Sequence, residues 1–285
     1  MKIAVVGLGT MGLPIARKLV AAGHEVAGFD VDPQRVELLG GASWNREEAD
    51  VLLCSLPNAE AVVQVASGVV TSGKPPIFVD MSTSPPSLAR RLSTELGAVG
   101  VAALDAPVSG GPMGAEAATL TVMVGGDAET FERIRPVFEA VGGLVVHVGG
   151  PGAGQTAKLC NNLVAGATMA ALAEACAVAE AEGIEPRVLY ELLSASTGDS
   201  RVLRNRFPLS GADEAHPASR DWVPLFALHL MTKDLKLVLA LAEEQGIDAS
   251  VAEAALERYE AAQAAGHGGL DYSGVFLAVR PDAAS

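Results

Sequence analysis

Lys158 and Asn162 lie four residues apart in a long alanine-rich segment that we expect to form one helix from about Gly154 to Gly183. At this spacing two side chains lie on the same face of a helix, one turn apart. The surrounding residues are small or apolar, and burial among such residues lowers the pKa of a lysine, which makes a neutral amine available as a proton acceptor. A lone helical lysine more commonly extends its ammonium group into solvent, so its interpretation as a base depends on the rest of the chain.

A glycine-rich turn near the N-terminus follows an apolar, β-branched strand and precedes an amphipathic helical segment; it consists of Gly7, Leu8, Gly9, Thr10, Met11 and Gly12. In a dinucleotide site the first glycine permits a tight turn, the second lets backbone amides approach the pyrophosphate, and the third lets helix and strand pack closely. Asp30 ends the next predicted strand, where a carboxylate accepts hydrogen bonds from the adenosine ribose. Asp30 would repel a 2′-phosphate and Val31 offers it no positive charge, so we expect NAD as the cofactor.

A second glycine cluster, residues 105–112, follows the strand predicted over 101–105. Ligands bind at the carboxyl ends of strands in α/β sheets, so Ser109 and the amides of Gly110 and Gly111 can hold a carboxylate there; an ordinary turn is the alternative. Lys233 and Asp234 lie in a helix of the C-terminal half, and a neighbouring pair of this kind is most often solvated surface.

Strand and helix patterns alternate along the first hundred residues, as in a parallel, doubly wound sheet. Further strands are predicted over 119–124 and 144–148, on either side of a helix over 128–141 that Pro136 should kink. Beyond the long helix every periodic segment is helical: 186–195, 225–244 and 250–266. We therefore predict an α/β fold with a Rossmann-type NAD-binding domain over 1–155. An all-α domain for substrate binding and oligomerisation follows over 156–285, joined through the long helix.

The composition excludes several classes of protein. The formal net charge of −14 argues against binding to nucleic acid or to anionic membranes. The three cysteines have no CxxC spacing and the five histidines form no ligand pair, so neither disulfides nor a metal site is indicated. The apolar N-terminal run is quickly broken by glycines, and the long helix carries polar residues, so we expect a soluble, cytoplasmic protein.

Taken together, the motifs resemble those of the β-hydroxyacid dehydrogenase family over nearly the whole chain. The blocks that carry the resemblance are GLGTMG at 7–12, LPN at 56–58, DMST at 80–83, DAPVSGG at 105–111, TLTVMVGG at 119–126, GAGQTAKLCNN at 152–162 and FALHLMTKDL at 226–235. Within the family, the chain is most similar to members that oxidise 3-hydroxyisobutyrate.

The resemblance implies roles for individual residues. Lys158 would be the catalytic base, Asn162 would position the substrate, and Ser109, Gly110 and Gly111 would bind its carboxylate. The cofactor would be contacted by the glycine turn, Asp30 and Val31. Further contacts would come from Leu56, Pro57, Thr83 and Lys233. Separately from the resemblance, the long helix is apolar or small on more than one face, so we expect a homo-oligomer, a dimer or tetramer. Ala118 stands where the family usually has glycine, for which we expect only a local backbone effect, and residues 210–224 match no family pattern.

The expected reaction is the NAD-dependent oxidation of a small 3-hydroxy acid by hydride transfer. A reductase of tartronate semialdehyde, glyoxylate or succinic semialdehyde is the alternative within the same scaffold. Imine reductases generally lack the lysine found here at position 158. A non-catalytic dinucleotide sensor would need the glycine turn and Asp30 but has no use for Lys158, Asn162 and Ser109 together.

Overall fold

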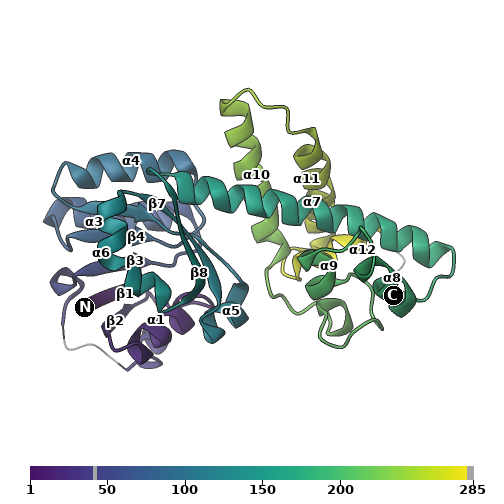
Figure 1. The fold of residues 1–285 in the computed structure, drawn as a ribbon, viewed down its shortest axis with the longest axis horizontal. Coiled ribbons are helices and arrows are strands. Elements are labelled where there is room, and N and C mark those ends of the chain that lie inside the picture. Colours follow the sequence, from purple (N-terminus) through teal and green to yellow (C-terminus); the bar gives the residue numbers. More distant parts are fainter. Residues whose placement is uncertain (41–43, 281–285) are drawn as a thin grey trace. The chain divides into compact units, whose positions relative to one another are not determined.

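The computed structural model describes residues 1–40 and 44–280, and it divides into two compact units (Figure 1). One unit runs from Met1 to Lys158 and the other begins at Leu159. The division falls inside helix α7 (Ala153–Ala181), which therefore begins in the first unit and continues into the second. The end of the predicted second domain, residues 281–285, lies outside the described residues.

The first unit is built on one eight-stranded sheet in the order β2-β1-β3-β4-β5-β7-β6, with β8 paired to β7. The first five strands are parallel, as predicted. Three of them, Lys2–Val6, Val51–Cys54 and Ile77–Asp80, are buried almost throughout, which is typical of strands covered on both faces. The strands are β1 (Lys2–Val6), β2 (Glu25–Phe29), β3 (Val51–Cys54), β4 (Ile77–Asp80), β5 (Ala102–Asp105), β6 (Val108–Ser109), β7 (Leu120–Gly126) and β8 (Gly142–Gly149).

The sheet is mixed, because β7 runs antiparallel to both β5 and β6. The connection from Ser109 to Leu120 contains only the short helix α5 (Gly111–Ala117). A parallel crossover needs a dozen or more residues, so this connection returns the chain in the opposite direction. β8 then pairs parallel to β7 after the longer crossover through α6 (Ala128–Glu139).

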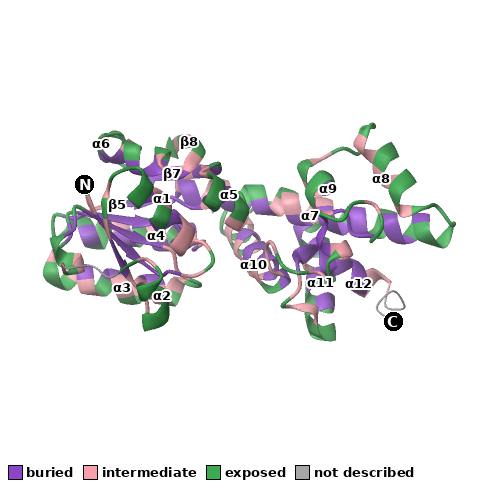
Figure 2. Ribbon diagram, turned by 90° about the horizontal axis from the view of Figure 1, so that it is seen from below, coloured by how far each residue is buried: buried purple, intermediate pink, exposed green. Residues whose placement is uncertain are grey.

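Helices cover both faces of the sheet, and the strands between them are buried (Figure 2). One core joins the sheet to α1 (Gly12–Ala21), α5 and α6, and the core on the other face joins it to α3 (Ala59–Ser72) and α4 (Pro86–Gly97). Asn58 and Asp127 begin α3 and α6 by accepting hydrogen bonds from backbone amides of the first turn. A short helix, α2 (Pro33–Glu37), follows β2.

The second unit is helical, and no strand occurs among its described residues. Its core is made by residues of α7 together with Phe207, Leu235 and Tyr259. The sequence pattern did not reveal α9 or α12, which are shorter than the periodicity needs. The helices after α7 are α8 (Pro186–Ser194), α9 (Arg201–Arg206), α10 (Leu228–Glu244), α11 (Ser250–Ala262) and α12 (Phe276–Val279).

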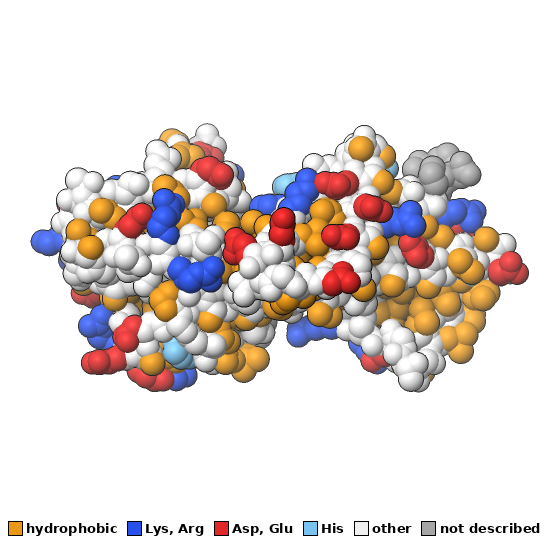
Figure 3. All heavy atoms as spheres, turned by 90° about the horizontal axis from the view of Figure 1, so that it is seen from above, with side chains coloured by type: hydrophobic (Ala, Val, Ile, Leu, Met, Phe, Trp, Pro, Cys, Tyr) orange, Lys and Arg blue, Asp and Glu red, His pale blue; other side chains and the backbone are white. Residues whose placement is uncertain are grey.

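Helix α7 is long and apolar enough to cross a membrane, but half of its apolar stretch is buried within the structure. Met169, Ala173 and Cys176 belong to the core of the second unit. Packing against protein therefore accounts for its composition. On the face shown in Figure 3, acidic side chains gather over α10 and α11, in keeping with the negative net charge.

Candidate active site

Only glycine fits two positions of the turn between β1 and α1. Gly7 has a φ of +91°, and a Cβ there would overlap the carbonyl oxygen of Ser55. A Cβ at Gly12 would overlap the carbonyl oxygen of Gly7, so α1 begins in direct backbone contact with the end of β1. At Gly9 a Cβ would meet only the Arg35 guanidinium, 3.6 Å away. The turn is thus closed on the protein side and open at Gly9, which fits a pyrophosphate approached by backbone amides.

Asp30 follows β2 and holds the glycine turn in place. Its carboxylate accepts hydrogen bonds from the backbone amides of Leu8, at 2.6 Å, and Asp32, at 2.9 Å. The guanidinium of Arg35 lies 3.9 Å from Asp30 and 3.5 Å from Asp32. Val31 is fully exposed. The sequence-based statement that Val31 supplies no positive charge is correct, but it overlooked Arg35, which lies beside the same carboxylate.

The loops after β3 and β4 are joined by hydrogen bonds. The Ser82 hydroxyl accepts from the amide of Leu56 at 2.9 Å, so the segment that holds Leu56 and Pro57 lies against the one that holds Thr83. The strand order reverses between β1 and β3, and ligands of doubly wound sheets bind at such a point. The predicted cofactor residues of the first unit therefore all follow the carboxyl ends of neighbouring strands.

Asp80, at the end of β4, is a buried carboxyl group. It accepts hydrogen bonds from the amide of Ser82 at 2.9 Å and the hydroxyl of Ser84 at 3.0 Å. Burial raises its pKa to about 6, although these hydrogen bonds act in the opposite direction. The nearby Asp105 carboxylate, paired with Asp80 in register across β4 and β5, raises the pKa further.

The second glycine cluster places Ser109 in β6 and Gly110 and Gly111 at the start of α5. Both glycines have positive φ, +135° and +64°, which directs successive amides around a tight bend. Ala118 ends α5 in the left-handed conformation, with a φ of +55°. The family's usual glycine suits that conformation better, so the departure at Ala118 is a site of backbone strain.

The first turn of α7 is fixed to the sheet by two buried polar residues. Asp105 accepts hydrogen bonds from the amides of Gly152 and Gln155, both at 2.8 Å. The Gln155 side chain accepts from the amide of Ser84 and donates to the carbonyl of Ser82. Burial raises the pKa of Asp105, and the hydrogen bonds from Gly152 and Gln155 oppose that rise. Lys158 follows one turn later and is buried, with 7% of its surface exposed.

In the second unit, Asn162 of α7 and Asp234 of α10 form a buried pair. The Asn162 amide donates to the Asp234 carboxylate at 2.6 Å, and the Lys233 ammonium lies 3.2 Å from the other carboxylate oxygen. Asp234 is 2% exposed. The interpretation of Lys233 and Asp234 as solvated surface is therefore wrong for Asp234.

The predicted residues fall into two groups. The first unit brings the glycine turn, Asp30, Leu56, Pro57 and Thr83 to one edge of the sheet and also holds Ser109–Gly111 and Lys158; the second unit holds Asn162 and Lys233. Sequence reasoning missed several polar residues that support these groups. Arg35 lies in α2, where no motif marks it. The others lie inside family blocks, which is the signal that could have found them: Asp80, Ser82, Asp105, Gln155 and Asp234.

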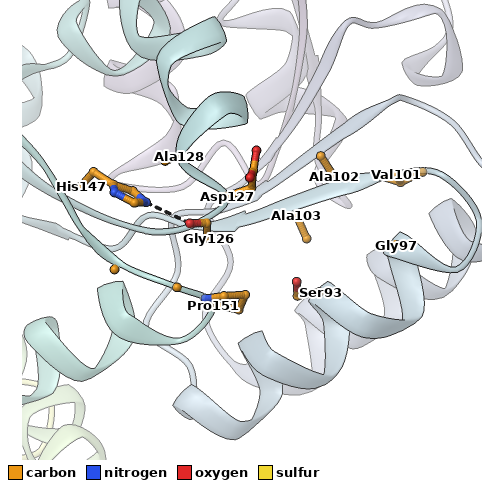
Figure 4. A pocket seen from close by; sticks show the side chains of 12 residues that line it. Ser93, Gly97, Val101, Ala102, Ala103, Gly126, Asp127, Ala128, His147 and Pro151 are labelled. Atoms are coloured by element: carbon orange, nitrogen blue, oxygen red, sulfur yellow. Dashed lines mark hydrogen bonds between the residues drawn. The ribbon is translucent and has the colours of Figure 1, made fainter.

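A surface hollow of about 610 Å³ opens elsewhere on the first unit (Figure 4). Its lining includes Ser93, Asp127 and His147, and the His147 ring nitrogen is 2.9 Å from the carbonyl oxygen of Gly126. None of the predicted site residues lines it. Within the described part of the chain, no group of three histidine, cysteine or acidic residues could hold a metal ion.

Two family profiles together match almost the whole chain. Residues 2–149 match the NAD-binding domain of 6-phosphogluconate dehydrogenase. Residues 152–279 match the NAD-binding domain of NADP-dependent 3-hydroxyisobutyrate dehydrogenase.

Relatives align with this chain over nearly its full length. A probable 3-hydroxyisobutyrate dehydrogenase of Mycobacterium tuberculosis is 39% identical, covering 98% of this chain and 97% of the relative. An NAD-dependent L-serine dehydrogenase of Pseudomonas aeruginosa is also 39% identical, covering 95% of each chain. A solved structure of Mycobacterium tuberculosis 3-hydroxyisobutyrate dehydrogenase with L-serine aligns with a TM-score of 0.90 at 38% identity, over 98% of this chain and 99% of that one.

The fold and the glycine turn are those of an NAD-dependent oxidoreductase that acts on CH–OH groups. The chain belongs to the β-hydroxyacid dehydrogenase family, among relatives named 3-hydroxyisobutyrate dehydrogenase.

Proposed function

We propose that this enzyme oxidises 3-hydroxyisobutyrate to methylmalonate semialdehyde, a step of valine degradation, with Lys158 as the general base. The observation that carries the proposal is the burial of Lys158. It lies one turn after Gln155, through which the first turn of α7 is hydrogen-bonded to Asp105 and to the loop after β4. The lysine is thereby held in the same unit as the cofactor-binding turn. A buried amine in such a place suits proton abstraction from a hydroxyl group.

Each residue has a separate task in this mechanism. The glycine turn holds the cofactor pyrophosphate, and Asp30 accepts hydrogen bonds from the ribose hydroxyls. When bound, NAD supplies the hydride acceptor. The neutral amine of Lys158 takes the hydroxyl proton, while Asn162 orients the substrate and Ser109, Gly110 and Gly111 bind its carboxylate. Leu56, Pro57, Thr83 and Lys233 complete the cofactor contacts.

L-Serine is a second candidate substrate. It is also a 3-hydroxy acid, and the Pseudomonas aeruginosa relative named for its oxidation is as similar as the relatives named for 3-hydroxyisobutyrate. Both substrates present a carboxylate and a primary alcohol at the same spacing. They differ at C2, where L-serine has an amino group and 3-hydroxyisobutyrate has a methyl group. Reduction of tartronate semialdehyde, glyoxylate or succinic semialdehyde uses the same groups in the opposite direction.

The test is a scan of initial rates, followed by NADH absorbance, with NAD and a panel of hydroxy acids. We expect the highest kcat/KM with 3-hydroxyisobutyrate, and the same panel with L-serine separates the two candidates. A protein that binds NAD but oxidises none of the acids, and reduces none of the semialdehydes with NADH, would be a dinucleotide sensor instead.

We also infer that the protein forms a homo-oligomer, most simply a dimer through its helical units. Val164, Ala171 and Val178 recur every seven residues on α7 and are all exposed, with Val164 and Val178 each 66% exposed. This spacing places the three apolar side chains on one face of α7, where they can pack against another helix. Sedimentation at micromolar concentration tests the inference: a dimer or tetramer is expected, replacement of Ala171 by Glu should dissociate it, and a wild-type monomer would refute it.

We place the enzyme in the cytoplasm. All three cysteines are free, and two of them, Cys54 and Cys176, are buried, as suits a reducing compartment. Cell fractionation with an activity assay tests this assignment.

A further inference from the structure

Gln155 is a fully buried amide whose side chain satisfies both of its hydrogen-bonding ends on the loop after β4. Its oxygen accepts from the Ser84 amide at 3.0 Å, and its nitrogen donates to the Ser82 carbonyl at 2.8 Å. Its own backbone amide donates to Asp105. The residue thus connects α7 to the ends of β4 and β5 through groups 50 to 73 positions away in the chain.

Backbone contact reinforces these hydrogen bonds. A Cβ at Gly154 would overlap the carbonyl oxygen of Met123, and one at Gly125 would lie 2.7 Å from the Gly154 amide nitrogen. The first turn of α7 therefore lies directly on β7, with no side chain between them. Neither a shift along the helix axis nor a rotation about it is possible while Asp105 and Gln155 keep their partners.

Lys158 is three residues after Gln155 on the same helix. Because each residue of an α-helix turns the chain by about 100°, a slip of one position would carry the amine to a different face. Reaction rates depend steeply on such placement, and a displacement of about 1 Å can lower the rate by about 10²-fold.

We propose that Gln155 is a positioning residue that sets the rotation and height of α7 and thereby places the Lys158 amine for proton abstraction. The inference rests on the proposed role of Lys158 as the base. Gln155 is fully buried, so in this proposal it acts through the helix and not by contact with substrate or cofactor.

The charged groups around Gln155 make one substitution informative. Asp80 of β4 and Asp105 of β5 lie on the sheet side, Arg90 of α4 lies beside Gly152, and Lys158 is on the same helix. In Gln155→Glu, a protonated carboxyl group keeps both contacts, since its OH donates to the Ser82 carbonyl. When the new carboxyl group of this variant is ionised, one of its oxygens faces the Ser82 carbonyl oxygen and the hydrogen bond is lost. The new negative charge also lies near Asp80 and Asp105.

The experiment compares three variants by kcat across pH, with folding confirmed by circular dichroism. Gln155→Met has a similar volume and neither hydrogen bond, and its kcat should fall by about 10²-fold, with the loss in kcat rather than in KM for NAD. For Gln155→Glu, the ratio of kcat to that of wild type should rise as pH falls. Thr156→Val is the matched control: it removes a hydroxyl bonded to Gly152 in the same turn and should keep wild-type kcat.

A readout independent of turnover is hydrogen exchange of apo protein, which should accelerate for residues 82–84 and 152–158 in Gln155→Met but not in Thr156→Val. The inference is overturned if folded Gln155→Met keeps wild-type kcat, or if the Gln155→Glu ratio does not change with pH.

A double-mutant cycle separates this inference from the proposed function. In a Lys158→Met background, Gln155→Met should lower kcat no further, because the residue acts through the lysine. If Lys158→Met alone is fully active, the proposed base is wrong. If Lys158→Met loses proton abstraction and Gln155→Met lowers its residual rate by the same factor as in wild type, Lys158 is the base. The positioning role of Gln155 is then refuted.

Discussion

Asn162 and Asp234 are joined by a 2.6 Å hydrogen bond between α7 and α10, in the interior of the helical unit. The Asp234 carboxylate also forms an ion pair with Lys233. Asn162, which we propose orients the substrate, is therefore held by a carboxylate that is itself paired with a lysine. A buried carboxylate needs such partners, and here it has two.

Removal of this acceptor should destabilise the protein. Asp234→Ala leaves the Asn162 amide buried without its partner, and the free energy of unfolding should fall by about 1–3 kcal/mol, measured by urea denaturation. Glu243→Ala, on the exposed side of α10, is the control and should change it by less than about 0.5 kcal/mol. Equal stability of the two variants would show that the pair contributes nothing.

Lys158→Met should abolish proton abstraction while preserving the fold, because methionine keeps most of the side-chain volume. General acid–base catalysis typically supplies roughly 10²–10⁴ in rate, so kcat should fall by at least about 10²-fold, with little change in NAD affinity. The wild-type oxidation rate should rise with pH as the amine loses its proton, and the variant should lack that rise. Lys236→Met, an exposed lysine on α10, should behave as wild type; a folded Lys158→Met within about tenfold of wild type places the base elsewhere.

The cofactor preference should follow the charges around Asp30. We expect NAD to be preferred over NADP, and Asp30→Asn combined with Val31→Arg should move the preference toward NADP, measured as the ratio of kcat/KM values. Arg35 offsets part of the negative charge of Asp30 and Asp32, so Arg35→Gln should sharpen the preference for NAD. A wild-type enzyme that uses NADP as well as NAD would contradict the role given to Asp30.

Asp80 should make the protein less stable as pH rises from about 4 to 6. Its pKa of about 6 in the folded state exceeds the ordinary value of 3.8, so the folded protein holds a proton that the unfolded chain releases. Stability from this group is present below pH 3.8 and is lost through pH 6.

Asp80→Asn keeps both hydrogen bonds, because its carbonyl accepts from Ser82 and its amide donates to Ser84. The variant should therefore lack this decline and be more stable at pH 7 by on the order of 2–3 kcal/mol, measured by denaturation across pH. The exposed Asp248→Asn should retain the wild-type decline. A parallel decline in Asp80→Asn would assign the effect to another group.

Ala118→Gly should stabilise the protein. Alanine pays a steric penalty of about 1–2 kcal/mol in the left-handed conformation, part of which is offset by the greater freedom of glycine in the unfolded chain. We expect a net gain of about 0.5–1 kcal/mol in thermal or urea denaturation. The neighbouring Ala117→Gly, within α5, should have the opposite sign, and a loss of stability in Ala118→Gly would show that the strain is relieved by its surroundings.

The sequence predicted the elements whose signals are local. The run from Lys2 to Val6, the turn at Gly7 and the long α7 each carry a period or a glycine whose meaning does not depend on the rest of the fold. The antiparallel return of β7 was missed because its direction depends on the length of the α5 connection, and that connection has no strong pattern. The short α9 and α12 have too few turns to show a period.

The sequence indicated candidate chemical groups but not the residues that support them. Lys158 and the glycine turn stand out by residue type, whereas Gln155 and Asp105 resemble ordinary polar residues until β4, β5 and α7 are brought together. Asp234 was read as surface because a Lys–Asp neighbour pair gives no sign of which face of the helix packs inward. Burial of a polar group depends on tertiary structure, and local sequence rarely specifies it.

The attachment of α7 to Asp105, Ser82 and Ser84 also bears on the order in which the chain acquires its structure during synthesis. All three acceptors and donors leave the ribosome well before Gln155, since the partners lie 50 to 73 positions earlier. The segments that hold these partners are therefore synthesised before the helix, and its opening turn can take its register from them. A circularly permuted chain that begins at α7 would have to form that turn with no template, and its slowest folding step should be the docking of residues 152–158.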